Sequence, residues 1–210
     1  MPAPDVANTA SEEKLLSPSS RERILLAAKH LFARNGYENT STVTIAREAG
    51  TSESQLMKHF GSKQGLLAAI LDRGWAAVIQ RVRALPADCR LGDRLLAMLE
   101  AIIIEMDHDA ELKELMTLEA RRVRKDSRDV LMSRDYRHFA ELLDGLLSEM
   151  RAQEQIRPDL NLQAVRGALI GMIESLLRDQ VVARRSDVTA DYNFDDMRRL
   201  IEVLVPALRG

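Results

Sequence analysis

The chain has few of the residues and segments that secreted and membrane proteins use. Cys89 is the only cysteine among 210 residues, so no intrachain disulfide can form, and a reducing cytoplasm fits this composition. No apolar run reaches the roughly 18 residues that a membrane-spanning helix needs. Asp5, Glu12 and Glu13 lie near the first residue without an apolar segment, so we expect no signal peptide. We therefore predict a cytoplasmic protein without membrane contact.

Signatures of common enzyme and metal sites are also missing. The chain has no HExxH motif, no pair of E-x-x-H motifs, no P-loop and no glycine-rich dinucleotide fingerprint. Its four histidines and one cysteine are too scattered to form a recognisable catalytic set. His108 lies between Asp107 and Asp109, which would suit a metal ion, but polar residues at a break between helices more often cap helix ends. We therefore predict no enzyme activity, no metal site and no cofactor.

Aromatic residues make up only 4% of the chain, whereas 46% of the residues are hydrophobic. The apolar positions recur at helical spacing almost throughout, which predicts an all-α protein of about nine helices. The expected helices cover residues 19–35, 41–49, 52–60, 62–83, 91–106, 110–124, 128–153, 161–183 and 194–208. Residues 1–18 lack this periodicity and are rich in Pro, Ala and Ser, so we expect a mobile arm there.

Residues 41–60 have the pattern of two short helices joined by a tight turn. The apolar positions of the two helices are Ile45, Ala46, Ala49, Leu56 and Phe60. Gly50 follows the first helix, where a left-handed backbone conformation suits glycine. Ser52 and Gln55 match an S-x-x-Q capping box, which opens a new helix. Such a pair is a helix-turn-helix, whose second helix typically enters the DNA major groove.

The charge of the chain is unevenly distributed. The net charge is −2, so the molecule as a whole is not a polycation. Residues 19–66, however, carry seven Lys or Arg against four Glu, a net of +3. The basic surplus therefore surrounds the predicted helix-turn-helix, where DNA phosphates would require it.

From Ser19 to Leu67 the chain resembles the TetR family of bacterial transcriptional regulators. The stretches that carry the resemblance are ILLAAKHLFARNGYENTS, TIAREAG and SESQLMKHFGSKQGLL, over about 49 residues. The resemblance implies a helix-turn-helix DNA-binding domain over 19–66 and a larger helical domain over 67–210 for ligand binding and dimerisation. It also implies a homodimer that binds a palindromic double-stranded DNA operator and releases it when a small molecule enters the larger domain.

The resemblance assigns DNA contacts residue by residue. The matching positions are Thr42, Val43, Glu53, Ser54, Gln55, Met57, Lys58, His59 and Lys63. Two residues depart from the family pattern. Met57 stands where relatives usually have a tyrosine whose hydroxyl bonds a phosphate, and its loss would remove roughly 1–3 kcal/mol. Thr51 replaces a commonly aliphatic turn residue, with little expected structural cost.

The candidate DNA contacts differ in the other roles open to them. Lys58 and Lys63 are expected to bind phosphates. Gln55 is either a base contact or occupied by its helix cap. Glu53 can accept a hydrogen bond from cytosine N4 but repels phosphate, so it is expected to exclude wrong sequences. For His59, a DNA contact and a place at the edge of the core both remain open.

The larger domain offers a candidate ligand cavity and a candidate dimer interface. The residues proposed to line the cavity are Trp75, Met98, Ile102, Met106, Met116, Phe139, Met172 and Leu176, although each alone could be ordinary core. The helix over 161–183 is apolar on two sides, so it could be the central helix of the domain and could also form, with the helix over 194–208, half of an intermolecular four-helix bundle. The residues predicted at that interface are Gly167, Gly171, Leu177, Val181, Leu200 and Leu204.

Taken together, the patterns predict a DNA-binding transcriptional regulator. We favour a repressor that binds its operator as a homodimer and is released by a small hydrophobic ligand through a population shift. The alternative is a ligand-independent or architectural DNA-binding protein, which would need no cavity.

Overall fold

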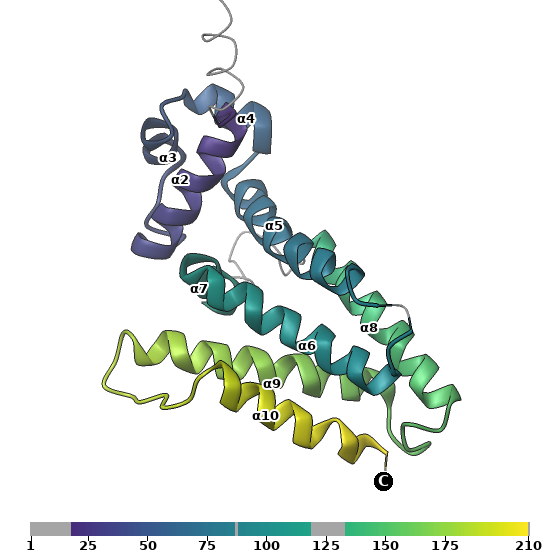
Figure 1. Ribbon diagram of the computed structural model, residues 1–210. Coiled ribbons are helices and arrows are strands. Elements are labelled where there is room, and N and C mark those ends of the chain that lie inside the picture. The colour runs from purple at the N-terminus through teal and green to yellow at the C-terminus, as the bar shows by residue number, and fades with distance from the viewer. Residues whose placement is uncertain (1–17, 87, 119–132, 210) are drawn as a thin grey trace, which may run out of the picture. The chain divides into compact units, whose positions relative to one another are not determined.

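The structure is a computed structural model that describes residues 18–86, 88–118 and 133–209, and within these ranges the chain is all-helical (Figure 1). Its helices are α2 (Ser20–Asn35), α3 (Thr42–Glu48), α4 (Glu53–Phe60), α5 (Lys63–Arg83), α6 (Leu91–His108), α7 (Ala110–Leu118), α8 (Arg134–Ala152), α9 (Leu162–Ala183), α10 (Phe194–Leu204) and the 3-10 turn η1 (Pro206–Leu208). The predicted all-α fold class is confirmed. The predicted mobile arm lies outside the described residues, apart from Pro18.

The chain divides into two compact units, residues 1–66 and 67–210. In the described part of the first unit, α2 packs against α3 and α4, and α3 packs against α4. The shared core consists of apolar residues from each helix and the first turn of α5, namely Ile24, Leu25, Ala28, Phe32, Ile45, Ala46, Leu56 and Leu66. Leu56 is the only residue of α4 that is fully enclosed, so one side chain anchors that helix.

Four serines begin the helices of the first unit. Each side-chain oxygen accepts a backbone N–H three residues ahead: Ser19 from Glu22, Ser41 from Thr44, Ser52 from Gln55 and Ser62 from Gly65, at 2.9–3.2 Å. These bonds satisfy N–H groups that a helix leaves unpaired in its first turn. Gly50 and Gly61 have φ values of +60° and +72°, which strain any residue with a Cβ, so α3 and α4 end there.

In the second unit, α6 is the central helix. It contacts α7, α8, α9 and α10, and in Figure 1 it lies between α8 on one side and α9 and α10 on the other. Its buried residues are Leu95, Met98, Leu99, Ala101, Ile102, Ile103 and Met106. The helix predicted over 161–183 is α9, which shares this central place, because it contacts α6, α7 and α8.

Several predicted helix limits need correction. The break expected over 107–109 is confined to Asp109, because its side chain accepts the Leu112 N–H at 2.9 Å and caps α7. His108 ends α6, and its Nδ1 lies 2.6 Å from the Ile104 carbonyl oxygen. At the chain's end, α10 stops at Leu204, since Pro206 has no N–H to continue the helix.

Parts of two predicted helices fall outside the described residues. For the helix over 110–124, the described part ends at Leu118, and for the helix over 128–153 the described part is α8, which Ser133 caps through the Tyr136 N–H at 3.1 Å. Among the helices that the structure describes, none is long and apolar enough to cross a membrane.

Candidate nucleic-acid interface and ligand site

The turn between α3 and α4 is held by backbone hydrogen bonds and by one arginine. The Thr51 N–H donates to the Ala46 carbonyl at 2.9 Å and the Gly50 N–H donates to the Arg47 carbonyl at 3.1 Å, which is the Schellman pattern of helix ends. The Arg23 Nε donates to the Ala49 carbonyl at 3.0 Å from α2. Arg23 is thus one of the basic residues near the helix-turn-helix, yet it braces the turn.

Two candidate DNA contacts bond to each other across the turn. The Thr42 hydroxyl donates to Glu53 Oε1 at 2.5 Å, joining the first turn of α3 to the first turn of α4. A carboxylate that accepts this bond has less freedom to accept one from a base. The Thr42–Glu53 bond therefore braces the start of α4 against the start of α3, a role that the sequence pattern did not predict for either residue.

The predicted capping box at the start of α4 is only half present. The Ser52 hydroxyl oxygen accepts the Gln55 N–H at 3.1 Å, as expected. The Gln55 Oε1, however, accepts from the Thr51 hydroxyl at 2.7 Å. A complete box would require it to accept from the Ser52 N–H. Thr51, which departs from the family pattern, supplies the competing donor.

The far end of α4 is tied to the start of α2. His59 Nε2 lies 3.2 Å from the Ser20 hydroxyl oxygen, and the His59 ring centroid lies 6.0 Å from that of Phe60. The Arg21 guanidinium lies 5.3 Å from the centroid of the Phe60 ring. His59 is exposed, but this arrangement favours the role at the edge of the core.

Lys63 is positioned by the turn after α2. Its ammonium lies 4.3 Å from the centroid of the Tyr37 ring and 3.4 Å from the Glu38 carbonyl oxygen. Tyr37 is itself buried and packs on Phe32, with ring centroids 5.1 Å apart. The lysine is thus held at the first residue of α5, where unpaired helix N–H groups also favour an anion.

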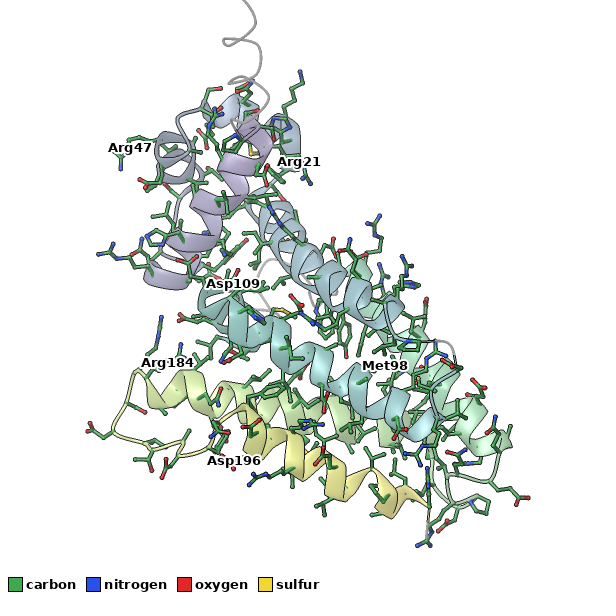
Figure 2. All side chains as sticks on the ribbon, viewed as in Figure 1. Arg21, Arg47, Met98, Asp109, Arg184 and Asp196 are labelled. Carbon is green, nitrogen blue, oxygen red and sulfur yellow. The ribbon has the colours of Figure 1, made fainter. Side chains whose placement is uncertain are left out.

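The remaining candidate contacts expose their side chains. Ser54 and Lys58 on α4 are exposed, while Val43 on α3 and Met57 on α4 are apolar residues with 59% and 42% of their surface exposed. Figure 2 shows Arg47 extending outward from α3. Arg47 was counted in the local charge but was not singled out from the sequence, because only its place on an exposed face distinguishes it from other arginines.

The second unit contains an aromatic cluster at the candidate ligand site. The Trp75 ring on α5 lies 5.0 Å from that of Tyr136 and 5.1 Å from that of Phe139, both on α8. Asp72 Oδ1 fastens the same two helices, because it accepts from the Ser133 hydroxyl at 2.7 Å and from the Asp135 N–H at 3.2 Å.

Five of the eight predicted cavity residues are buried and three are partly exposed. Trp75, Met98, Ile102, Met106 and Phe139 are at most 5% exposed, whereas Met116, Met172 and Leu176 are partly exposed. A polar cavity of about 580 Å³ lies beside other residues, among them Asp107, Gln180, Tyr192 and Phe194. A ligand site among the eight predicted residues therefore stays a prediction.

Lys113 on α7 belongs to a buried polar network that the sequence pattern did not predict. It is only 1% exposed, and its ammonium lies 3.2 Å from both Asp107 Oδ1 and Gln180 Oε1. The Gln180 amide in turn donates to the Tyr192 carbonyl at 3.1 Å. This chain of bonds links α6, α7, α9 and the loop before α10. Its members lie up to 85 residues apart, so no local pattern predicts it.

The predicted dimer interface needs a correction on α9. Leu177 and Val181 are 2% and 3% exposed within the protomer, because they form the inner of the two apolar sides of α9, so they leave no surface for a partner. The exposed large apolar residues of α9 and α10 are Val182, Leu200, Val203 and Leu204. A Cβ added at Gly167 or Gly171 would meet nothing within 4 Å, so these positions remain open.

Comparisons with known proteins identify the chain's relatives. Residues 24–70 match the sequence model described as "Bacterial regulatory proteins, tetR family". The HTH-type transcriptional regulator UidR of Escherichia coli (strain K12) is 24% identical over 162 residues, which cover 76% of this chain and 81% of UidR. The HTH-type transcriptional activator FasR of Mycolicibacterium smegmatis is 31% identical over 121 residues, 51% of this chain and 55% of FasR.

Solved structures share the fold over most of the chain. The fatty acid degradation regulator FadR from Bacillus halodurans superimposes with a TM-score of 0.77 at 17% identity, covering 90% of this chain and 96% of that one. FadR from Bacillus subtilis, in complex with stearoyl-CoA, gives a TM-score of 0.76 at 19% identity over 88% and 97% of the two chains.

These relatives are regulators, and the region that the family model matches includes α3, the turn and α4. These comparisons support a DNA-binding transcriptional regulator with a helix-turn-helix domain of the TetR type over residues 24–70.

Proposed function

We propose that this regulator is a repressor that binds a palindromic operator as a homodimer through residues 19–66 and leaves it when an apolar ligand enters residues 67–210. The observation that carries the proposal is the rigid mounting of α4. The Thr42–Glu53 bond holds its start and the His59–Ser20 contact holds its end, while Ser54, Met57 and Lys58 are exposed. A helix fixed in this way can present the same side chains to each major groove.

Phosphate binding is proposed for Lys58 and Lys63. Lys58 is exposed one turn beyond the start of α4, and Lys63 is held by Tyr37 and Glu38 at the start of α5. Two such contacts on each protomer would fix the position of α4 along the DNA duplex without distinguishing one base sequence from another.

The phosphate contacts are tested by the salt dependence of operator binding. The operator is first selected from random duplexes with the wild-type protein. Lys58→Ala and Lys63→Ala should each weaken binding and lower the slope of log K against log salt by about 0.9 per lost contact in the complex. Arg34→Ala is the matched control, because it removes one exposed charge from the end of α2. Slopes that stay unchanged in both lysine variants would contradict the assignment.

For the ligand we propose a long-chain acyl group carried on coenzyme A. Two observations support this class: the buried ring of Trp75 on α5 packs against Tyr136 and Phe139 of α8, and a structure with the same fold, that of Bacillus subtilis FadR, holds stearoyl-CoA. The ligand would favour a conformation in which the two α4 helices no longer match successive major grooves, about 34–36 Å apart. The helix α5 is the proposed lever, because it begins at Lys63 and continues into the second unit.

Ligand binding can be followed through Trp75, the only tryptophan of the chain. Stearoyl-CoA should change its fluorescence and raise the melting temperature, because a ligand that binds the native state stabilises it by mass action. Free coenzyme A and octanoyl-CoA separate recognition of the carrier from recognition of the long chain. If no member of this series changes either signal, the proposed ligand class is wrong, and the ligand-independent alternative gains support.

The homodimer is proposed to form through the outer faces of α9 and α10. Leu200, Val203 and Leu204 lie on α10 and Val182 at the end of α9, each between 37% and 70% exposed. Large apolar side chains that stay exposed in the protomer are typical of a protein contact. Gly167 and Gly171 would let a partner helix approach α9 closely.

A further inference from the structure

The helix-turn-helix exposes two apolar side chains where polar ones would be expected on a DNA-binding surface. Val43 is the second residue of α3 and is 59% exposed, and Met57 is the fifth residue of α4 and is 42% exposed. Leu26 on α2 is the other large apolar residue with a comparable exposure in the described part of this unit. Val43 and Met57 therefore need an account that ordinary core packing does not supply.

The Thr42–Glu53 bond brings the two positions into one region. Val43 follows Thr42 directly in α3, and Met57 lies four residues, or about one helical turn, after Glu53 in α4. Residues four apart share a helix face, so Met57 extends the face on which Glu53 lies. The bond thus joins the first turn of α3, which carries Val43, to α4 about one turn before Met57.

Three polar side chains of α4 that could read bases are bonded within the unit, whereas Ser54 and Lys58 on α4 and Arg47 on α3 are exposed. Glu53 accepts from Thr42, Gln55 Oε1 accepts from Thr51, and His59 Nε2 meets Ser20. Lys58 is exposed and suited to a phosphate. Bidentate recognition of adenine or guanine, which needs a free amide or guanidinium fork, therefore has few donors left on α4.

The major groove offers one apolar group for such a surface, the C5 methyl group of thymine. We infer that Val43 and Met57 contact thymine methyl groups in each operator half-site and so select thymine at those positions. This inference rests on the proposed operator binding by α3 and α4. The unbranched thioether of Met57 adapts to a methyl group whose position varies, while the β-branched Val43 is stiff and suits one fixed position.

Discrimination against the other bases follows from the same contact. Cytosine lacks the methyl group and presents an amino group at the adjacent position, which would face an apolar side chain without a hydrogen-bond partner. Removing only the methyl group forfeits the burial of one carbon, about 0.8 kcal/mol, or about a fourfold loss of affinity for each methyl group contacted.

The test removes methyl groups from the DNA and side chains from the protein in one cycle. Each thymine of the selected operator is replaced in turn by deoxyuridine, symmetrically in both half-sites. Binding is measured for the wild type, Val43→Ala, Met57→Ala and the control Leu26→Ala, with thermal melts to verify folding. At two or more thymine positions, the replacement should lower the operator affinity of the wild-type protein by about fourfold for each methyl group removed. Met57→Ala should remove the loss at one position and Val43→Ala at another, while Leu26→Ala keeps both.

Two further variants test whether the deoxyuridine penalty depends on an apolar side chain at position 57. Met57→Leu keeps an apolar side chain and should keep the deoxyuridine penalty, whereas Met57→Gln should lose it. The inference is overturned if the wild type binds deoxyuridine operators as tightly as thymine operators, or if the alanine variants show the same penalties as the wild type. In both cases the protein would still bind its operator in a salt-dependent way, so the inference would fail while the proposed function stands. If the wild type selects no sequence at all, the proposed function and this inference both fail.

Discussion

Different kinds of interaction stabilise the two units of the protein. In residues 18–66, short helices are joined by hydroxyl and amide groups, as in the four serine caps and the Thr42–Glu53 bond. In residues 67–209, long helices share a large apolar core around α6, and acid–base pairs such as Arg81–Glu105 at 2.7 Å and Arg198–Glu100 at 2.6 Å join helices at its surface.

This difference fits the function proposed for each unit. A surface that docks into DNA needs a fixed backbone and exposed cations. Short hydrogen bonds between polar side chains hold the backbone and leave the cations exposed. A unit that admits a ligand and pairs with a second copy needs apolar volume and apolar surface, which long helices supply. The comparison predicts that changes in the first unit alter DNA binding alone, while changes in the second alter ligand response, association or global stability.

The largest expected effect separates the two units. Leu56 is fully buried and is the single core residue of α4, so Leu56→Ala should destabilise the first unit by about 2–5 kcal/mol and abolish operator binding. The thermal transition reported by Trp75 in the second unit should hardly move. Leu99→Ala, equally buried on α6, is the matched change and should shift the Trp75 transition strongly. If both variants shift it equally, the units do not unfold separately and the comparison fails.

The next effect concerns association through the second unit. Val203→Glu places a charge on the most exposed apolar side chain of α10. A buried charge without a partner costs several kcal/mol, so the dimer should dissociate at least about a hundredfold more readily. Val188→Glu, at a site 61% exposed in the loop before α10, should leave it unchanged. Sedimentation velocity measures both. A stable Val203→Glu dimer would show that α10 does not form the interface.

A smaller effect is expected from removing the Thr42–Glu53 hydrogen bond between α3 and α4. Thr42→Val removes the hydroxyl that donates to Glu53, and a bond to a charged acceptor contributes about 1–3 kcal/mol. Operator affinity should fall by about tenfold while the salt slope stays constant, because no phosphate contact is lost. Glu53→Gln keeps an acceptor and should cost less. A lower salt slope in Thr42→Val would indicate that Thr42 contacts phosphate directly.

The smallest effect is a pH dependence in the second unit. Burial, with a contribution from the charge of Asp179, raises the pKa of Tyr192 above its usual value of 10.0, and its hydroxyl donates to the Leu176 carbonyl at 2.6 Å. Folding therefore favours the neutral phenol, so this stabilisation is complete below pH 10 and is lost as the pH rises through the folded-state pKa. In the Tyr192→Phe variant, the free energy of unfolding measured by urea denaturation should fall less between pH 9 and about 11 than in the wild type. An equal loss in wild type and variant would contradict the assignment.

How much could be predicted from the sequence follows from the range of each interaction. Serine caps and glycine turns act over three or four residues, so the limits of α3 and α4 were predictable. The Thr42–Glu53 bond spans 11 residues, and the Lys113–Gln180 bond spans 67, so their pairing depends on how helices dock. The same reason explains the errors. Gln55 lost its predicted cap partner to Thr51, and Leu177 and Val181 face inward because α9 packs on α6, α7 and α8.

The most direct test of the account is operator binding measured by fluorescence anisotropy as stearoyl-CoA is added to the complex of the wild-type dimer with its selected operator. The account predicts that the operator is released over the same range of ligand concentration in which the Trp75 fluorescence changes, and that coenzyme A alone releases none. An operator that stays bound while Trp75 reports a saturated ligand site would contradict the claim that the second unit controls DNA binding by the first.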